Sequence, residues 1–312
     1  MKHNKADNVN GWLIIDKPRG IGSTQVVSKT RYLLHANKNG HTGTLDPFAT
    51  GVLPIAFGEA TKLVPFVTNG KKEYEFVLKF GEQTSTDDTE GEVIARSDKI
   101  PTRDEIMAVL PQFIGTITQV PPMYSAIRIN GQQAYKLARK GTQVEMPARQ
   151  VEIYALELLE KYDDSAKFKV ECSKGTYVRT LGKDIAQKLG TVGHLIELRR
   201  TKCGIFDLKS KILLDSLEKM EYVEERRKSL LPVETSLRDI AEIAVSAEEA
   251  LKLMKGQSLS PKGFNLNPTT KTAAAKYQNC LIALVQIDER KISPIRVFNL
   301  IDIKENTDVD NK

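Results

Sequence analysis

The chain has 312 residues, of which 40% are hydrophobic and 28% charged, enough for one large and one small packed domain. Its net charge of +6 favours a polyanionic partner such as nucleic acid, although an ordinary soluble protein with a basic bias fits equally well. The cysteines are far apart and the histidines are scattered, which argues against a disulfide framework and a metal motif. The N-terminus is polar and the apolar runs are short, which argues against a signal peptide and a membrane span.

Apolar and alternating stretches predict the strands of an α+β fold. These strands lie at residues 12–15, 72–80, 151–159, 167–172, 281–288 and 292–300. Helical periodicity and capping patterns predict helices between them, with Ser23 or Thr24 as the first cap and a capping box at 101–105. The helices occupy residues 23–35, a segment that opens at 101–105, 132–140, 178–189, 215–228 and 247–255. The pattern changes near residues 232–242, so we expect a large domain at 1–235 and a small β-rich one at 236–312.

The densest segment for chemistry is the loop from Gly40 to Pro54, in which glycines and Pro47 shape a tight turn around Asp46. One interpretation is that Asp46 and Pro47 only start a turn. A phosphate-cradling loop is a weaker interpretation, because the loop lacks the Gly-Lys-Ser/Thr ending of a P-loop. Chemistry alone leaves a catalytic Asp46 as one hypothesis among these.

This loop resembles the signature loop of the TruB family, the bacterial tRNA pseudouridine-55 synthases. The resemblance extends over several motifs in the same order, roughly from residue 10 to residue 205. They are Gly11-Trp12-Leu13-Ile14-Ile15-Asp16-Lys17-Pro18, His41 to Pro54, Gly58-Glu59-Ala60-Thr61-Lys62, Lys72-Glu73-Tyr74, Pro122-Met123-Tyr124-Ser125-Ala126, Cys172 to Thr180 and Leu198-Arg199-Arg200. Linked motifs of this kind make the signal specific.

The resemblance implies a pseudouridine-synthase fold, which is a mixed, mostly antiparallel sheet flanked by helices, followed by a small PUA-like RNA-binding module. It implies isomerisation of one uridine in the T arm of tRNA, by cleavage of the glycosidic bond, rotation of the base and formation of a C5–C1′ bond. This reaction needs no cofactor or metal. By the same resemblance we expect a cytoplasmic monomer that requires no protein partner.

The resemblance also implies roles for single residues. Asp46 is the expected nucleophile, and whether it attacks the base, attacks the sugar or first removes a sugar proton stays open. Burial beside Leu45 and Phe48 should raise its pKa, and Arg179 is the expected cation that opposes this. The expected substrate-binding residues are Tyr74, which stacks on the uracil, Tyr177, the backbone of Leu198, and His41, which fills the space left by the extruded base.

Charged segments complete these expectations. The stretch from Gln119 to Gln150 carries five basic residues and one acidic residue, a net charge of 5 − 1 = +4, where the family has an RNA-contacting insertion. We expect RNA contacts from Arg128, Lys136, Arg139 and Lys140, and from Lys17 in the first motif. The acidic stretch from Thr86 to Glu90 lacks Ca²⁺-loop spacing and is interpreted as a surface hairpin.

Two other functions stay open at this point. The chain could be a related synthase that acts on another RNA or needs a guide-RNA scaffold, although its short mixed-charge tail favours a stand-alone tRNA enzyme. It could instead be a non-catalytic RNA-binding or tRNA-folding factor, which the presence of Asp46 disfavours as the only activity.

Overall fold

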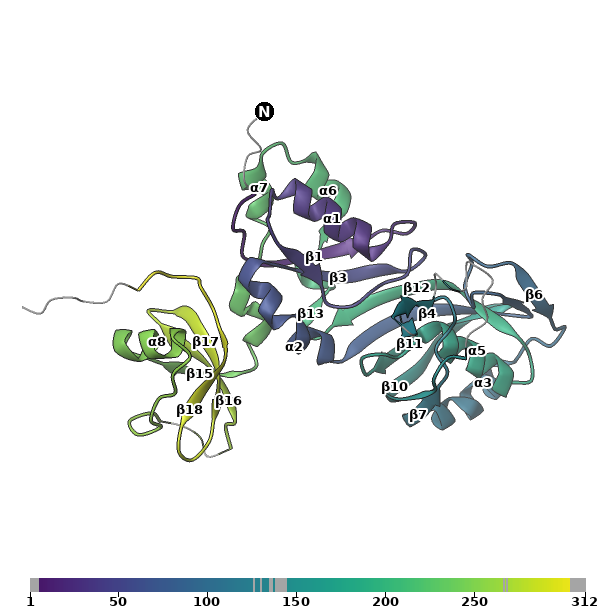
Figure 1. The fold of residues 1–312 in the computed structure, drawn as a ribbon. Helices are drawn as coiled ribbons and strands as arrows, with labels where there is room; N and C mark the ends of the chain where they lie inside the picture. The colour runs from purple at the N-terminus through teal and green to yellow at the C-terminus, as the bar shows by residue number, and fades with distance from the viewer. Residues whose placement is uncertain are drawn as a thin grey trace, which may run out of the picture.

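The computed structural model describes residues 6–125, 127–129, 131–134, 137, 145–265, 267 and 269–303. A long twisted sheet runs through the larger part of the molecule, and a separate small sheet lies at one end (Figure 1). The large sheet contains parallel and antiparallel pairs, mostly antiparallel. The predicted α+β fold with a mixed sheet is therefore confirmed.

The main path of the large sheet follows the order β14-β1-β3-β12-β4-β11-β10-β7. These strands are β14 (Ile212–Leu213), β1 (Gly11–Lys17), β3 (Thr50–Phe57), β12 (Gly193–Cys203), β4 (Lys72–Phe80), β11 (Ser165–Cys172), β10 (Arg149–Lys161) and β7 (Gly115–Gln119). At its side, β2 (Asn39–His41) pairs with β3 and β13 (Phe206–Asp207) pairs with β12. Four strands central to the site, β3, β12, β4 and β11, therefore lie side by side.

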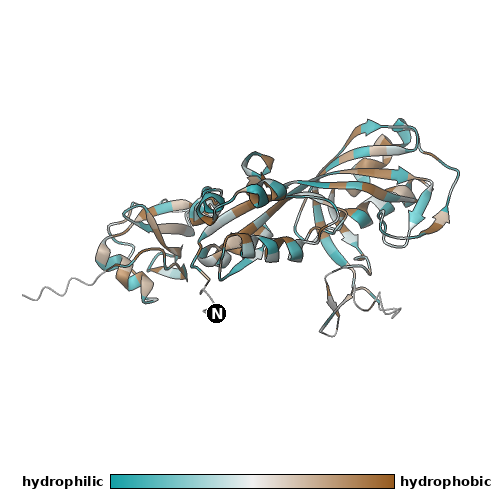
Figure 2. Cartoon of the chain, turned by 90° about the horizontal axis from the view of Figure 1, so that it is seen from above, coloured by the Kyte–Doolittle hydropathy of each residue, from teal (hydrophilic) through white to brown (hydrophobic). Residues whose placement is uncertain are grey.

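Strand alternation gives this sheet two different faces. On β4, Tyr74, Phe76 and Leu78 belong to the main hydrophobic core, whereas Glu73 and Glu75 on the opposite face pair with lysines of β11. Helices cover the apolar face, and hydrophobic and hydrophilic residues alternate along the strands (Figure 2). The covering helices are α1 (Ser23–Leu33), α3 (Arg103–Val109), α5 (Val178–Lys188) and α6 (Leu214–Lys219).

Helix starts show where the capping predictions apply. Helix α3 has Thr102 as its N-cap and shows the predicted capping box, in which the Glu105 side chain accepts from the Thr102 backbone. The cap of α1 is Gly22, not Ser23 or Thr24, because the Ser23 hydroxyl bonds the backbone of Leu45 instead. The single helix predicted at 215–228 is two short helices, α6 and α7 (Val223–Arg227), since Met220 turns to an extended conformation.

The segment between β7 and β10 begins as a short hairpin. Its strands, β8 (Arg128–Ile129) and β9 (Gln132–Gln133), pair antiparallel. Gln132 and Gln133 are therefore in a strand, where the sequence predicted the start of a helix. The rest of the helix predicted at 132–140 falls mostly outside the described residues.

The C-terminal sheet has the order β15-β16-β17-β18, formed by β15 (Ala241–Ala244), β16 (Thr272–Tyr277), β17 (Cys280–Ile287) and β18 (Ile292–Val297), with helix α8 (Ala247–Met254) packed on it. A second hydrophobic core joins this module to the far face of β1 and β3, where Trp12 packs in one cluster with Leu284 and Phe298. Trp12 Nε1 also donates to the Val233 carbonyl at 3.0 Å. The module is thus packed against the larger domain. Within the described residues, no helix is long and apolar enough to cross a membrane.

Candidate active site

The loop that carries Asp46 is held by core packing on both sides of the aspartate and by hydrogen bonds. The flanking residues Leu45 and Phe48 are each only 3% exposed, so both sides of the carboxylate are anchored in the core. Ser23, at the start of α1, accepts from the Leu45 amide and donates to the Leu45 carbonyl, both at 2.8 Å. The Asp46 carbonyl accepts from Ala49, which closes the turn. This packing fixes the direction of the Asp46 side chain, which stays 30% exposed.

Lys17 supports this loop and lies away from solvent. Its side chain is fully buried, and Nζ donates to the carbonyls of Pro18, Ile21 and Pro47 at 2.9, 2.7 and 3.2 Å. Burial lowers the pKa of Lys17 to about 8, although the Asp46 charge opposes this. The sequence predicted an RNA contact for Lys17, but a side chain with no exposed surface presents nothing to a phosphate. Its geometry instead ties the first motif to the Asp46 loop.

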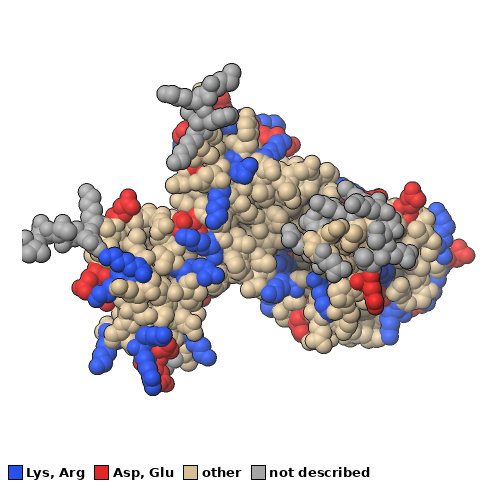
Figure 3. Space-filling model, viewed as in Figure 1, with Lys and Arg blue, Asp and Glu red and all other residues tan. Residues whose placement is uncertain are grey.

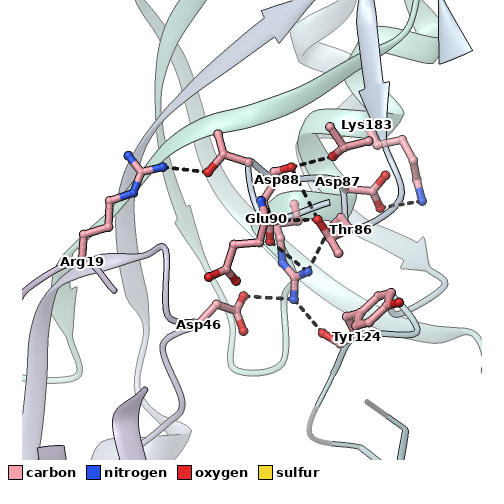
Figure 4. A network of polar contacts seen from close by, with 11 residues as sticks. Arg19, Asp46, Thr86, Asp87, Asp88, Glu90, Tyr124 and Lys183 are labelled. Atoms are coloured by element: carbon pink, nitrogen blue, oxygen red, sulfur yellow. Dashed lines mark hydrogen bonds and ion pairs between the residues drawn. The ribbon is translucent and has the colours of Figure 1, made fainter. Parts of the chain in front are cut away.

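Arg179, the second residue of α5, forms an ion pair with Asp46. Its Nη2 lies 3.0 Å from Asp46 Oδ2 and also donates to the Tyr124 carbonyl at 2.9 Å. Its Nη1 lies 3.3 Å from Asp88 Oδ2 and donates to the Thr86 carbonyl at 2.9 Å. Figure 4 shows these contacts converging from three separate segments of the chain. The guanidinium is only 3% exposed and its orientation is strongly restricted.

The acidic stretch from Thr86 to Glu90 forms part of this network, which the sequence interpretation missed. It connects β5 (Glu82–Thr84) to β6 (Val93–Arg96), so a hairpin is present, but Asp87 and Asp88 are 6% and 1% exposed. Asp88 is buried because Arg179 neutralises it and Thr86 Oγ1 donates to it at 2.6 Å. The interpretation as a surface hairpin is therefore wrong for these two carboxylates.

The charges around Asp46 compete. Desolvation raises the pKa of the Asp46 carboxyl, the Arg179 guanidinium lowers it, and the Asp88 carboxylate raises it further. The net direction is upward from the ordinary value of an aspartate. Burial and the opposing cation were both expected from the sequence, whereas the contribution of Asp88 was not.

A cavity of about 250 Å³ opens beside Asp46. Its lining brings together five of the predicted site residues, namely Asp46, Tyr74, Tyr177, Arg179 and Leu198. Among the residues that the structure describes, the lining also contains four further cationic side chains, Lys72, Arg149, Lys174 and Arg200. One carboxylate thus faces five cations, which suits a polyanionic substrate.

Tyr74 belongs to the wall formed by β4 and is 9% exposed. Burial raises the pKa of Tyr74 to about 12, so its phenol is protonated at neutral pH, although the neighbouring Arg200 opposes this shift. Arg200 itself is fully buried and donates to the carbonyls of Val52 and Gly43 at 2.7 and 3.1 Å. Gly51 has φ +101°, and a Cβ there would collide with the Arg200 carbonyl, so only glycine allows β3 to approach β12 this closely.

Tyr177 also lines the cavity, and it is the N-cap residue of α5. The fully buried Gln119 side chain accepts from the Tyr177 amide at 3.1 Å and donates to its carbonyl at 3.3 Å. The Arg149 guanidinium carbon lies 4.6 Å from the centre of the Tyr177 ring. Both Gln119 and Arg149 restrict the tyrosine, and no sequence pattern had pointed to either role.

His41 does not line the cavity, although the next residues in the chain do. Its Nδ1 accepts from the Gly43 amide at 3.1 Å, so the neutral ring carries its proton on Nε2. Burial, and secondarily Arg200, lower the pKa of His41. The residue is therefore placed at the edge of the site as a neutral ring.

Four predicted RNA contacts cannot be located. Lys136, Arg139 and Lys140 lie outside the described residues, as does the side chain of Arg128, whose backbone belongs to β8. Within the described part of the chain, no group of three or more His, Cys, Asp or Glu side chains could hold a metal ion.

Comparisons with known proteins show what this chain is similar to. The family model described as TruB family pseudouridylate synthase (N terminal domain) matches residues 31–178, and the tRNA pseudouridylate synthase B C-terminal domain matches residues 179–238. The tRNA pseudouridine synthase B of Caulobacter vibrioides is 45% identical over 96% of this chain and 99% of its own. That of Bradyrhizobium diazoefficiens is 46% identical over 94% of this chain and 87% of its own. Among solved structures, a Cbf5-Nop10-Gar1 complex aligns with a TM-score of 0.68 and 26% identity, covering 93% of this chain and 84% of the other.

Proposed function

Because the chain belongs to the TruB family of pseudouridylate synthases, we propose that it converts uridine-55 in the T arm of tRNA to pseudouridine, with Asp46 as the nucleophile. The observation that carries the assignment of Asp46 is its place in the cavity. It is the carboxylate in the described lining, and it lies 3.0 Å from a buried arginine. Among the described residues of the lining, no other acidic side chain competes for the role.

The chemistry fits an isolated, oriented carboxylate. The N1–C1′ bond of the uridine breaks, the base turns while it is held, and C5 bonds to C1′. C5 loses its proton and N1 gains one, so atoms balance within the nucleotide. Asp46 supplies the nucleophile, and Arg179 keeps it ionised and aimed when RNA excludes water, since charge interactions strengthen in a lower dielectric.

The cavity walls hold the base during this rotation. Tyr74 stacks on the uracil, and the backbone of Leu198 on β12 bonds its polar edge. The target base leaves its stack to reach Asp46 in the cavity, and His41 fills the space that it vacates. A neutral His41 suits this place, because it enters the nucleic acid without a charge to desolvate.

The rest of the tRNA lies over the surface around the cavity. On the face shown in Figure 3, lysines and arginines gather on both sides of the recess between the C-terminal module and the larger domain. We assign phosphate contacts to the insertion at about 119–150, through Arg128, Lys136, Arg139 and Lys140. The catalytic domain is residues 1–235, and residues 236–312 form a PUA-like module that adds RNA contacts. We expect a cytoplasmic monomer that works without a protein partner.

The module is held in place for such a role. Lys62 Nζ donates to the Val297 carbonyl at 2.9 Å, and the Asn299 amide donates to Glu59 Oε2 at 2.8 Å. Together with the shared core around Trp12, these bonds keep the two parts in one relative position. A rigid pair of surfaces can recognise the shape of a folded tRNA arm.

An assay on a T-arm hairpin, without ATP or added metal, tests the proposed function. The expected result is one pseudouridine at the position that corresponds to uridine-55, and none in a hairpin with cytidine there. Binding of the hairpin without conversion would favour an RNA-binding or folding factor. Conversion of another RNA in preference to this hairpin would favour a different synthase.

A further inference from the structure

The five cations that line the cavity do not have equivalent partners. Arg179 meets two carboxylates, and the buried Lys72 and Arg200 donate to backbone carbonyls. Arg149 and Lys174 differ in burial, because Arg149 is partly exposed and Lys174 is exposed, and no carboxylate of the described residues lies within ion-pair distance of either. Like Lys72 and Arg200, they have no carboxylate partner among the described residues, but their exposure lets an anion of the substrate reach them.

Arg149 is already held in one orientation. Its guanidinium lies over the Tyr177 ring at 4.6 Å and donates through Nη2 to the Gly175 carbonyl. Its Nε is buried and has no hydrogen-bond partner among the described residues. The Gly175 and Tyr177 contacts therefore hold the planar group in one orientation before any ligand arrives, and Nη1 makes no hydrogen bond to the described residues.

Lys174 lies one residue from Gly175, on the same loop. Within the described part of the chain, its ammonium donates one hydrogen bond, to the neutral Asn69 side chain, where Nζ lies 2.7 Å from Oδ1. The side chain is exposed, so an anion can reach it from solvent. Two cations with neutral partners thus flank Gly175, a residue with φ +86° whose missing side chain leaves the Arg149 guanidinium against the backbone.

The substrate offers one kind of anion to these cations. Uridine is neutral, and the only charges of the target nucleotide and its neighbours are phosphodiesters. We propose that Arg149 and Lys174 form a phosphate subsite, which binds a phosphodiester adjoining the target uridine when that nucleotide enters the cavity. This inference rests on the proposed function, and it adds the group that holds the backbone of the extruded nucleotide.

The subsite changes the role of Tyr177. One face of its ring is covered by Arg149, so that face is not free for stacking with the uracil. Tyr177 then acts as the support of Arg149, and Gln119 fixes Tyr177 through both of its backbone groups. Tyr74 remains the ring that contacts the base.

The test is a double-mutant cycle that combines a substitution in the protein with a chemical change in the RNA. Equilibrium binding of T-arm hairpins is measured with protein that also carries Asp46→Asn, so that the RNA is not converted. Arg149→Met and Lys174→Met are each combined with a hairpin that carries one uncharged methylphosphonate, on the 5′ or the 3′ side of the target. Each protein change should weaken binding of the unmodified hairpin about tenfold, the scale of a hydrogen bond to a charged group. It should also lower the salt slope by about one. At one of the two positions, the methylphosphonate should weaken binding of the hairpin to the parent protein by a similar factor. At that position it should weaken binding to the Met variants by little more.

Lys71→Met is the matched control. Lys71 is an exposed lysine near the same edge of the sheet, but Glu171 neutralises it and it does not line the active-site cavity. It should bind every hairpin like the parent protein. Thermal unfolding must first show that each variant is folded. The subsite is overturned if the losses of binding from the protein change and from the methylphosphonate add at both positions. It is also overturned if the Met variants bind like the control. The proposed function fails separately, if the unmutated chain binds the hairpin and never converts it.

Discussion

Arg179 approaches Asp46 through a single nitrogen, with Nη2 3.0 Å from Oδ2, and not through a two-pronged contact. Its second terminal nitrogen is committed to Asp88. The arginine therefore bridges two carboxylates and two backbone carbonyls. We infer that Arg179 acts through these shared contacts. They connect the catalytic loop to the turn at Thr86 to Glu90 and to Tyr124 in the insertion.

Arg179→Ala should nearly abolish turnover, by roughly 10²–10³-fold or more, the scale of removing one preorganised charge-stabilising group. Arg179→Lys should remain clearly impaired, because one ammonium can reach Asp46 but cannot also hold Asp88 and both carbonyls. Loss of the cation removes the contribution that lowers the pKa of Asp46. The acidic limb of the pH–rate profile should therefore move to higher pH.

Single-turnover rates against pH, at saturating RNA, test this. Full rescue by saturating RNA with an unshifted profile would mean that Arg179 is a phosphate anchor.

Asp88→Asn should shift the same limb in the opposite direction. The Asp88 carboxylate raises the pKa of Asp46, so its neutralisation lets Asp46 stay ionised to lower pH. The plateau rate should nevertheless fall, on the order of a hundredfold, since a small misplacement of Arg179 and Asp46 costs about that much. The same single-turnover series measures both effects. An upward shift of the limb would contradict the assigned electrostatics.

Much of the site was predictable, because family motifs mark Asp46, Tyr74 and Arg179 in sequence. Lys17 was not, since a buried lysine and an RNA-binding lysine look alike in a motif, and the Pro47 carbonyl that helps to bury it is 30 residues away. Asp88 was missed for a similar reason. An acidic turn between polar residues is typical of a surface, and only the approach of α5 makes it part of the core.

The fold shows the same division. The strand predicted at residues 72–80 is present with those bounds, because its alternation is local. The cap of α1 depended on a distant partner for Ser23, the Leu45 backbone, which no local pattern reveals.

Tyr74→Leu should slow single-turnover catalysis more than it weakens binding. A stacked base contributes about 1–3 kcal/mol, and loss of orientation adds to the barrier. Tyr74→Phe should be milder, because the phenol, with its pKa near 12, is protonated at neutral pH and the ring is kept. A Tyr74→Leu rate equal to that of the unmutated protein would exclude the stacking role.

Lys17→Met should act through the fold of the active-site loop. It leaves the part-buried carbonyls of Pro18 and Ile21 without their donor, at up to about 1–3 kcal/mol for each, whereas the Pro47 carbonyl keeps the Gly20 amide. The variant should unfold at lower temperature and turn over more slowly, with an unchanged salt dependence of RNA binding. A salt slope reduced by about one would restore Lys17 as a phosphate contact.

Asp46→Asn tests the central claim most directly. The amide has nearly the size of the carboxylate but cannot attack, so the single-turnover rate on a T-arm hairpin should fall on the order of a millionfold, as when another covalent nucleophile is deleted. RNA affinity should stay within a few-fold of that of the unmutated protein. A residual rate within about a hundredfold would contradict the assignment of Asp46 as the nucleophile.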